Sequence, residues 1–400
     1  MGFDYDVIVV GAGPGGSTAA RRCARAGLKT LLVEKERMPR YKVCGGCLSL
    51  KAVNLLGLNL RPVLERTIDR VRFSYRLKDS FSIEWKQPIA FMVMRDRFDQ
   101  FLVKQASDEG AGVLEGVSVV SLEQKNDGVV VVLGEGERIC CEYLVGADGS
   151  ESLVGKSLSF LPPRGEGNGF GIESEIPYEF TVGFPEEELR LVHLDFGGVP
   201  NGYGWVFPKK EGLSVGVGGM LRGARRVNLR QHFNTFVHGL NYVRKEKVEK
   251  IFGHSLPSFY DEKQQVAKGK VLLVGDAAHL MDPLMGEGIY YALRSGMLAA
   301  EAIVESKECG LAPSALYQRK VQESISENLK WALQFSRFVF RFTNLAYRTL
   351  KHYRDLADLY VQVLEGKETY QGFVQRVKER MRDLLGGKIS ERIKRAMAGG

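Results

Sequence analysis

The sequence lacks the features that mark membrane-spanning, secreted and metal-binding chains. No apolar run reaches the roughly 18 residues that a membrane-spanning helix needs, and a predicted strand in FDYDVIVV (3–10) begins at once, without a signal peptide. Only six cysteines occur in 400 residues, and without a secretion signal we expect thiols. CGGC (44–47) has no second CxxC and no neighbouring histidines, so we expect no metal. These absences predict a cytoplasmic protein.

A strong charge imbalance is also lacking. The net charge is +8 and the pI about 9.0, a mild basic excess for 400 residues. No nucleic-acid-reading module accompanies it, so we expect no nucleic-acid partner. Anionic lipid headgroups are the acidic partner that stays open.

The first 35 residues alternate between predicted strand and helix. DVIVV (6–10) is a continuous apolar run, as expected for a parallel strand that is covered on both faces. GAGPGG (11–16) follows, then a predicted helix over 17–26 and a second strand in LKTLLVEK (28–35). Gly11, Gly13 and Gly16 form GxGxxG after a strand and before a helix, which is the context that dinucleotide binding requires. The first glycine allows a tight turn, the second lets the backbone approach a pyrophosphate, and the third permits close helix packing. Glu34 ends the second strand, where a carboxylate can accept from ribose hydroxyls.

Two later stretches favour FAD over NAD as the nucleotide. GADGS (146–150) and VGDAAHLMDPLMGEG (274–288) each end a predicted strand. They resemble fingerprints of the FAD-dependent oxidoreductases typified by para-hydroxybenzoate hydroxylase. The resemblance implies that Asp276 contacts the ribityl chain and that the backbone at Pro283, Gly286 and Gly288 approaches the flavin; a helix N-cap is the alternative role of Asp276. The residues expected to bind the cofactor are Gly11, Gly13, Pro14, Gly15, Gly16, Glu34, Lys35, Cys44, Gly45, Arg95, Asp148, Gly275, Asp276, Pro283, Gly286, Gly288 and Ile289.

Two arginines have open roles. Arg95 and Asp99 match the RxxxD of the same family, whose arginine contacts the cofactor, while an i,i+4 surface pair is the alternative. Arg40 either reaches the adenosine phosphates or is a surface charge.

The whole pattern predicts an α/β fold with a discontinuous Rossmann-type FAD-binding domain, a β-rich substrate domain and a C-terminal helical region. We expect the FAD-binding domain at 1–75, 90–160 and 265–310. The β-rich substrate-binding domain is expected at 76–89 and 161–264, and the helical region at 311–400.

PNGYGWVFP (200–208) places three aromatic residues at alternate positions between two prolines, and SVGVGG (214–219) follows. With KVCGG (42–46), this stretch resembles the signature of the geranylgeranyl reductase family. Side chains at alternate strand positions share a face, so Tyr203, Trp205 and Phe207 are expected to form an apolar wall for a polyprenyl chain. Gly216 and Gly218 are expected to let the next strand pass close to ligand or cofactor. Plain sandwich core is the alternative on pattern alone.

The resemblance implies reduction of isolated C=C bonds in an isoprenoid lipid substrate, with flavin hydride transfer coupled to protonation. Cys44 is the candidate to supply or position the proton; a cysteine that only shapes its loop is the alternative. A redox-active Cys44–Cys47 pair is a further alternative. The electron donor is NAD(P)H or ferredoxin. A monooxygenase or halogenase on the same scaffold, and a non-catalytic lipid-binding flavoprotein, are the competing functions.

Basic residues gather near the C-terminus on a pattern of helical spacing. Apolar residues recur at 331, 335, 338, 342 and 345, which predicts a helix. Such a basic amphipathic surface favours peripheral contact with an anionic membrane, and a solvated helical face is the alternative. The basic residues are Arg337, Arg341, Arg348, Lys351, Arg376, Lys378, Arg380, Arg382, Lys388, Arg392, Lys394 and Arg395.

Overall fold

The computed structural model of the chain describes residues 2–160, 162–163, 166–220, 227–248 and 250–385. The chain divides into two units, each assembled from three separate segments. The first comprises 1–42, 95–167 and 257–327, and the second 43–94, 168–256 and 328–400. Against the expected domain boundaries, this division places residues 43–75 and 90–94 in the second unit and residues 161–167, 257–264 and 311–327 in the first, and it groups residues 328–400 with the second unit.

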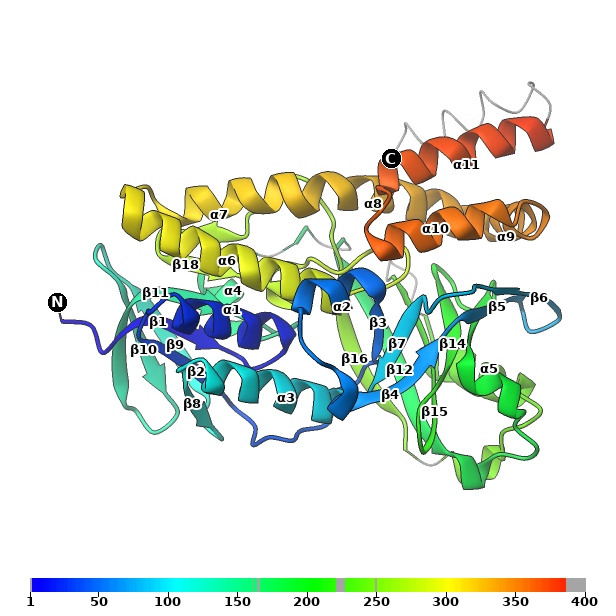
Figure 1. Ribbon diagram of the computed structural model, residues 1–400, viewed down its shortest axis with the longest axis horizontal. Coiled ribbons are helices and arrows are strands. Elements are labelled where there is room, and N and C mark those ends of the chain that lie inside the picture. The colour runs from blue at the N-terminus through cyan, green and yellow to red at the C-terminus, as the bar shows by residue number, and fades with distance from the viewer. Residues whose placement is uncertain (1, 161, 164–165, 221–226, 249, 386–400) are drawn as a thin grey trace. The chain divides into compact units, whose positions relative to one another are not determined.

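The first unit is built on an eight-stranded sheet with the order β17-β18-β11-β1-β2-β8, to which β9 and β10 add as an antiparallel pair beside β11. β1 lies between β11 and β2, parallel to both, and α1 packs against α3 and α6 (Figure 1). Its elements are β1 (Tyr5–Val10), α1 (Pro14–Arg25), β2 (Thr30–Glu34), α3 (Arg95–Asp108), β8 (Gly112–Glu115), β9 (Val119–Gln124), β10 (Val129–Leu133), β11 (Arg138–Gly146), α4 (Leu153–Ser157), β17 (Ala267–Lys268), β18 (Val271–Leu273), the short helix η5 (Gly275–Ala278), α6 (Ile289–Cys309), α7 (Pro313–Val321) and the π-helical η6 (Gln322–Ser326).

Helix α1 begins three residues earlier than the sequence predicts. Pro14 occupies the first turn, where its missing N–H costs nothing, and extended Gly13 precedes it. The prediction of a start at 17 treated the glycines as loop, whereas two of them lie within the helix. The first helical turn therefore directly follows Gly13.

The second unit is built on a seven-stranded sheet of order β16-β12-β15-β14-β13-β5-β6, with a three-stranded sheet β3-β7-β4. β12 pairs with β15, β15 with β14 and β14 with β13, all antiparallel, whereas β13 pairs with β5 in parallel. Its elements are β3 (Cys47–Ser49), α2 (Leu50–Leu56), η1 (Arg61–Val63), β4 (Leu64–Ile68), β5 (Arg70–Tyr75), β6 (Asp79–Glu84), β7 (Ala90–Val93), β12 (Asn168–Pro177), η2 (Tyr178–Phe180), η3 (Glu186–Arg190), β13 (Leu191–Phe196), β14 (Gly202–Pro208), β15 (Gly212–Met220), α5 (Leu229–Gly239), η4 (Lys245–Lys247), β16 (Phe252–Pro257), α8 (Glu327–Arg341), α9 (Thr343–His352), α10 (Asp355–Glu365) and α11 (Tyr370–Leu385).

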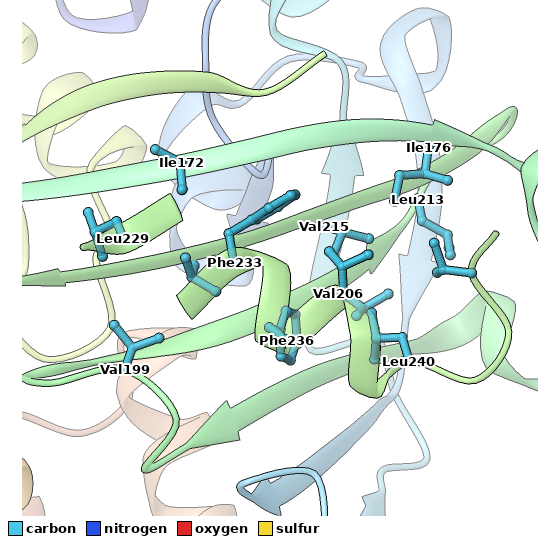
Figure 2. Packing of buried hydrophobic residues seen from close by; sticks show 13 residues of the cluster. Ile172, Ile176, Val199, Val206, Leu213, Val215, Leu229, Phe233, Phe236 and Leu240 are labelled. Carbon is cyan, nitrogen blue, oxygen red and sulfur yellow. The ribbon is translucent and has the colours of Figure 1, made fainter. Parts of the chain in front are cut away.

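Different helices cover the two faces of the seven-stranded sheet. On one face, Phe233 and Phe236 of α5 pack with valines of β14 and β15 into a hydrophobic core (Figure 2). On the other, Tyr347 of α9 contacts the rings of Tyr75 and Phe81, with centroids 5.6 and 5.7 Å apart. Cross-strand partners share a face, so Tyr203, which pairs with Phe196 and through it with Tyr75, lies on the α9 face.

The C-terminal helix that the spacing predicts over 331–345 is broken. Helix α8 ends at Arg341, Phe342 leaves helical geometry, and α9 begins at Thr343. Phe335 and Phe338 are buried, whereas Phe342 is 37% exposed, because it falls at the junction. The apolar spacing therefore spans two helices.

Several of the basic residues expected to face a membrane have partners. Arg376 pairs with Glu368 and Arg380 with Asp355, while Lys378 lies over the ring of Trp331. Lys388, Arg392, Lys394 and Arg395 lie outside the described residues. Among the helices that are described, none has the length and apolar character to cross a membrane.

Candidate functional site

The three motif glycines in the turn between β1 and α1 have different surroundings. Gly11 has φ +101°, and a Cβ there would lie 2.3 Å from the carbonyl oxygen of Ala147. A Cβ on Gly16 would lie 1.9 Å from the oxygen of Gly11, whereas nothing lies within 4 Å of a Cβ on Gly13. Gly11 and Gly16 are therefore required by packing, while Gly13 opens to free space at the start of α1. This open cradle at a helix N-terminus fits a pyrophosphate.

The carboxylate of Glu34 holds the same turn in place. One of its oxygens accepts the backbone N–H of Ala12 at 2.8 Å and the other accepts that of Glu36 at 3.2 Å. The side chain is almost fully buried at the end of β2, while neighbouring Lys35 is exposed. Glu34 thus orders the glycine loop by hydrogen bonds that sequence analysis did not predict. It does so from the strand end where a carboxylate was expected to meet a ribose.

Arg95 and Asp99 form a buried pair, so the surface-pair alternative is wrong. The guanidinium of Arg95 donates to both oxygens of Asp99 at 2.8 Å, and Asp99 is fully buried. Arg40 also donates to Asp99 at 3.0 Å and lies 3.5 Å from Glu34. Arg40 is therefore not a free surface charge, because it bridges the carboxylates of Asp99 and Glu34.

The loop after β18 presents an acidic side chain beside an open glycine. Gly275 has φ +58°, and its N–H donates to the hydroxyl of Ser295 at 2.9 Å. A Cβ on Gly288, at the start of α6, would lie 3.7 Å from Oδ1 of Asp276. The N-cap alternative for Asp276 is wrong, because no side chain caps η5. Within the described chain, its carboxylate has no hydrogen-bond partner, which fits a group that receives ribityl hydroxyls.

Two aspartates in these loops have structural partners. Asp148 accepts from the hydroxyl of Ser152 at 2.6 Å and from the N–H of Val154 at 3.0 Å, so it orders the start of α4. Asp282, which sequence analysis did not select, is 1% exposed and accepts the N–H groups of Leu284 and Met285. Asp282 thereby fixes the loop that carries Pro283, Gly286 and Gly288, and buried Ile289 follows it as the first residue of α6.

Cys44 and Gly45 belong to the second unit, where their loop is held by two buried charged residues. The N–H of Cys44 donates to Glu173 at 2.6 Å, and Glu173 is fully buried. Lys209, 3% exposed, donates to the carbonyl oxygens of Gly45 and Val93 at 2.5 and 2.8 Å. Burial lowers the pKa of Lys209, while nearby Glu175 acts to raise it. The loop is thus ordered from β12 and from the end of β14.

The thiol of Cys44 is half-buried, and its Sγ accepts the N–H of Gly46 at 3.4 Å. Cys44 and Cys47 are both free thiols in the structure. No cluster of histidine, cysteine or carboxylate side chains suited to a metal is found among the described residues.

The aromatic row forms as the alternation predicts. Tyr203, Trp205 and Phe207 are half-buried on one face of β14, and their neighbours along the strand are buried on the other. Ring centroids are 6.2 Å apart between Tyr203 and Trp205 and 6.3 Å apart between Trp205 and Phe207. A Cβ on Gly45 would lie 2.7 Å from the ring of Phe207. The cysteine loop therefore packs on one end of the row, although more than 150 residues separate them.

Gly216 of β15 makes room for the indole of Trp205. A Cβ on Gly216 would lie 2.1 Å from Cζ2 of Trp205, and Gly216 lies directly opposite Trp205 in the sheet. A Cβ on Gly218 would meet the indole at 3.4 Å, an ordinary contact. Trp205 therefore lies across β15, toward the position of Glu173 on β12.

This geometry predicts that Gly216→Ala displaces Trp205, whereas Gly218→Ala does not. Forcing a methyl into a packed site typically costs about 1–3 kcal/mol, so we expect the urea midpoint of Gly216→Ala to fall and tryptophan fluorescence to shift. Gly218→Ala is the matched control, with the same change of residue two positions along the same strand. Equal behaviour of the two variants would contradict the packing described here.

Glu173 and Lys209, which hold the cysteine loop, are residues that sequence analysis missed. Neither was part of a quoted motif, and charged residues are ordinarily solvent-facing. The position of Glu173 in β12 could have indicated its burial. Glu173 lies between buried Ile172 and Ser174 and is the sheet partner of Gly216, so its side chain is on the same face as the glycines of β15.

Comparison with known proteins agrees with these features. A family model described as FAD binding domain matches residues 4–176 and 258–319. The chain is 31% identical to an uncharacterized protein of Methanosarcina barkeri, over 92% of each chain. It is 30% identical to a menaquinone reductase of Mycobacterium tuberculosis, over 84% of this chain and 85% of that one. It is also 30% identical to a chloroplastic geranylgeranyl diphosphate reductase of Nicotiana tabacum, over 77% of this chain and 68% of that one.

Solved structures share the fold. A geranylgeranyl bacteriochlorophyll reductase-like protein of Thermoplasma acidophilum aligns over 97% of this chain and 98% of that one, with a TM-score of 0.77 and 24% identity. A flavin-dependent brominase aligns over 95% and 99%, with a TM-score of 0.71 and 19% identity. The α/β fold with an FAD-binding domain, predicted from the sequence, is thereby confirmed.

The matched family model spans the glycine turn, the Glu34 strand and the Asp276 loop, and the full-length relatives span both units. The chain therefore belongs to the geranylgeranyl reductase family of FAD-dependent oxidoreductases, and FAD is its cofactor.

Proposed function

We propose that the protein reduces isolated C=C bonds in the isoprenoid chain of a lipid. The observation that supports this most is the contact between the cysteine loop and the aromatic row, because Gly45 packs on Phe207 and lies near Trp205. A polyprenyl chain offers only methyl groups and double bonds, so its recognition needs apolar surface and no hydrogen bonds. The half-buried rings of Tyr203, Trp205 and Phe207 supply that surface.

The reaction requires a hydride and a proton to be added across one double bond. Bound FAD, when reduced by NAD(P)H or a ferredoxin, supplies the hydride equivalent. An isolated alkene has no carbonyl to accept negative charge, so the proton must reach the less substituted carbon as the hydride reaches the tertiary one. The rings exclude water from developing positive charge. Cys44 is proposed to supply or position the proton, held by Glu173 through its N–H.

The relatives named above define the candidate substrates. Their names include a diphosphate of geranylgeraniol and a menaquinone, which share an isoprenoid chain and differ in the attached group. The alternative function of a halogenase is supported by the similarity of fold to a flavin-dependent brominase. No residue of the aromatic row Tyr203, Trp205 and Phe207 supports it.

The proposal is tested by mass spectrometry of isoprenoids incubated with the reduced protein under anaerobic conditions. We expect geranylgeranyl diphosphate or a menaquinone to gain two hydrogen atoms for each double bond reduced. An unchanged mass for isoprenoids that bind would identify a carrier, and oxygen-dependent modification of an aromatic substrate would identify a monooxygenase or halogenase.

Cys44→Ser is the matched variant in this assay. General acids contribute about 10²–10⁴-fold to rates, so we expect turnover to fall by about 100-fold with FAD content unchanged. Cys47→Ser, the matched control in the same loop, should keep its activity. Normal turnover of Cys44→Ser with FAD bound would show that Cys44 only shapes the loop, and loss in both variants would favour a dithiol mechanism.

A further inference from the structure

We propose that a pocket at the α8–α9 junction binds the anionic end of the isoprenoid substrate, as a phosphate or diphosphate. The inference rests on the proposed function. The pocket has a volume of about 1070 Å³, at the upper end of the range for small-molecule sites. It lies within the second unit, between the β5–β6 turn, the β13–β14 loop, α5 and the α8–α9 junction.

The lining of this pocket is cationic. Arg76, Lys78, Arg341 and Arg348 contribute to it. In the part of the chain that the structure describes, Arg341 and Arg348 form no ion pair. They come from either side of the break at Phe342, so the interruption of the helix places them together at one pocket. A guanidinium pair of this kind suits the geometry of a phosphate.

The only acidic side chain among the described lining residues, Asp195, offsets part of the charge of Arg76. Asp195 is 2% exposed, and one of its oxygens accepts from the hydroxyl of Ser74 at 2.6 Å and the N–H of Leu77 at 2.7 Å. These bonds point the carboxylate into the sheet and the β5–β6 turn. With the basic side chains of Arg76, Lys78, Arg341 and Arg348 against this one carboxylate, the described lining is net positive, which favours an anionic ligand.

An aromatic path leads from this pocket to the cysteine loop. Tyr75 lines the pocket and is the sheet partner of Phe196. The ring of Phe196 lies 5.8 Å from that of Tyr203, and the row then continues through Trp205 to Phe207, where Gly45 packs. From Tyr203 to Phe207 the strand advances about 13 Å. An amphipathic ligand with its anionic end among the arginines would thus lay its apolar chain toward Cys44.

Binding of farnesyl phosphate, farnesol and inorganic diphosphate to the oxidised FAD-loaded protein tests the proposal. We expect farnesyl phosphate to bind at least tenfold more tightly than farnesol by calorimetry. Arg341→Gln/Arg348→Gln should weaken farnesyl phosphate binding by about tenfold and leave farnesol binding unchanged. Lys86→Gln, which removes an exposed charge outside the pocket, is the matched control.

Three results would overturn the proposal. Binding of inorganic diphosphate as tight as that of farnesyl phosphate would identify a site for free phosphate. A double variant that keeps the full preference for farnesyl phosphate would show that the two arginines do not bind its anionic end. A double variant that loses only its binding to anionic phosphatidylglycerol vesicles would identify a membrane-facing surface. Because no electron donor is present, these outcomes are separate from the proposed function: expected binding without reduction in the mass spectrometric assay would overturn the reaction and not the pocket.

Discussion

Gly16→Ala is expected to yield a protein without FAD and with a free energy of unfolding lower by about 3 kcal/mol or more. The new Cβ would lie 1.9 Å from the oxygen of Gly11 and 2.9 Å from the Cβ of Ala147. A backbone oxygen cannot rotate away as a side chain does, so α1 must move relative to the turn. The flavin absorbance per protein and the urea unfolding curve measure the two effects.

Gly13→Ala is the matched control, since it makes the same change three residues away in the same turn. Nothing lies within 4 Å of its Cβ, and its φ of −73° suits alanine. We expect the apo variant to unfold within about 1 kcal/mol of the parent, which is the usual cost of alanine at an N-cap. Its affinity for FAD should fall strongly, because the methyl enters the open cradle. A Gly16→Ala protein with full FAD and an unchanged unfolding curve would contradict this account of the turn.

The contrast between these glycines shows how far the sequence determines the cofactor site. The motif assigns Gly11 to the turn, Gly13 to the phosphates and Gly16 to helix packing, and the surroundings of each glycine agree. Such local geometry is predictable because it depends on residues close in sequence. Strand alternation likewise placed Tyr203, Trp205 and Phe207 on one face.

Long-range partners were beyond the reach of the sequence. Glu173 contacts a loop 129 residues away, and Lys209 contacts one 164 residues away. No local sequence pattern encodes these long-range contacts, which follow from the strand order β12-β15-β14. The break at Phe342 was missed for a related reason: apolar spacing continues through it, and only packing on the sheet decides where α8 ends.

Lys209→Met is expected to release the cysteine loop. Lys209 is the donor to the carbonyl oxygens of Gly45 and Val93, and an unsatisfied buried polar group costs about 1–3 kcal/mol. Its charge also lies near buried Glu173 and half-buried Glu175, so its removal leaves these carboxylates without their cation. We expect the free energy of unfolding to fall by about 3–5 kcal/mol and turnover to fall with it.

Lys210→Met is the matched control for this change. Lys210 is the next residue, its side chain is exposed, and its backbone N–H donates to Glu65 while its carbonyl oxygen accepts from Arg66. The same loss of a lysine charge should therefore leave the unfolding curve within about 0.5 kcal/mol of the parent.

The rate of alkylation at Cys44 separates a loosened loop from a general loss of stability. In the parent, Cys44 is half-buried and its loop is held from both sides by Glu173 and Lys209, whereas Cys309 is exposed. Under conditions where Lys209→Met stays folded, Cys44 should react with iodoacetamide faster than in the parent, while Cys309 reacts at an unchanged rate. Glu173→Gln should accelerate Cys44 less, because its amide oxygen still accepts the N–H of Cys44. Equal acceleration at both cysteines would show global unfolding, and no acceleration at Cys44 would mean that Lys209 does not hold the loop.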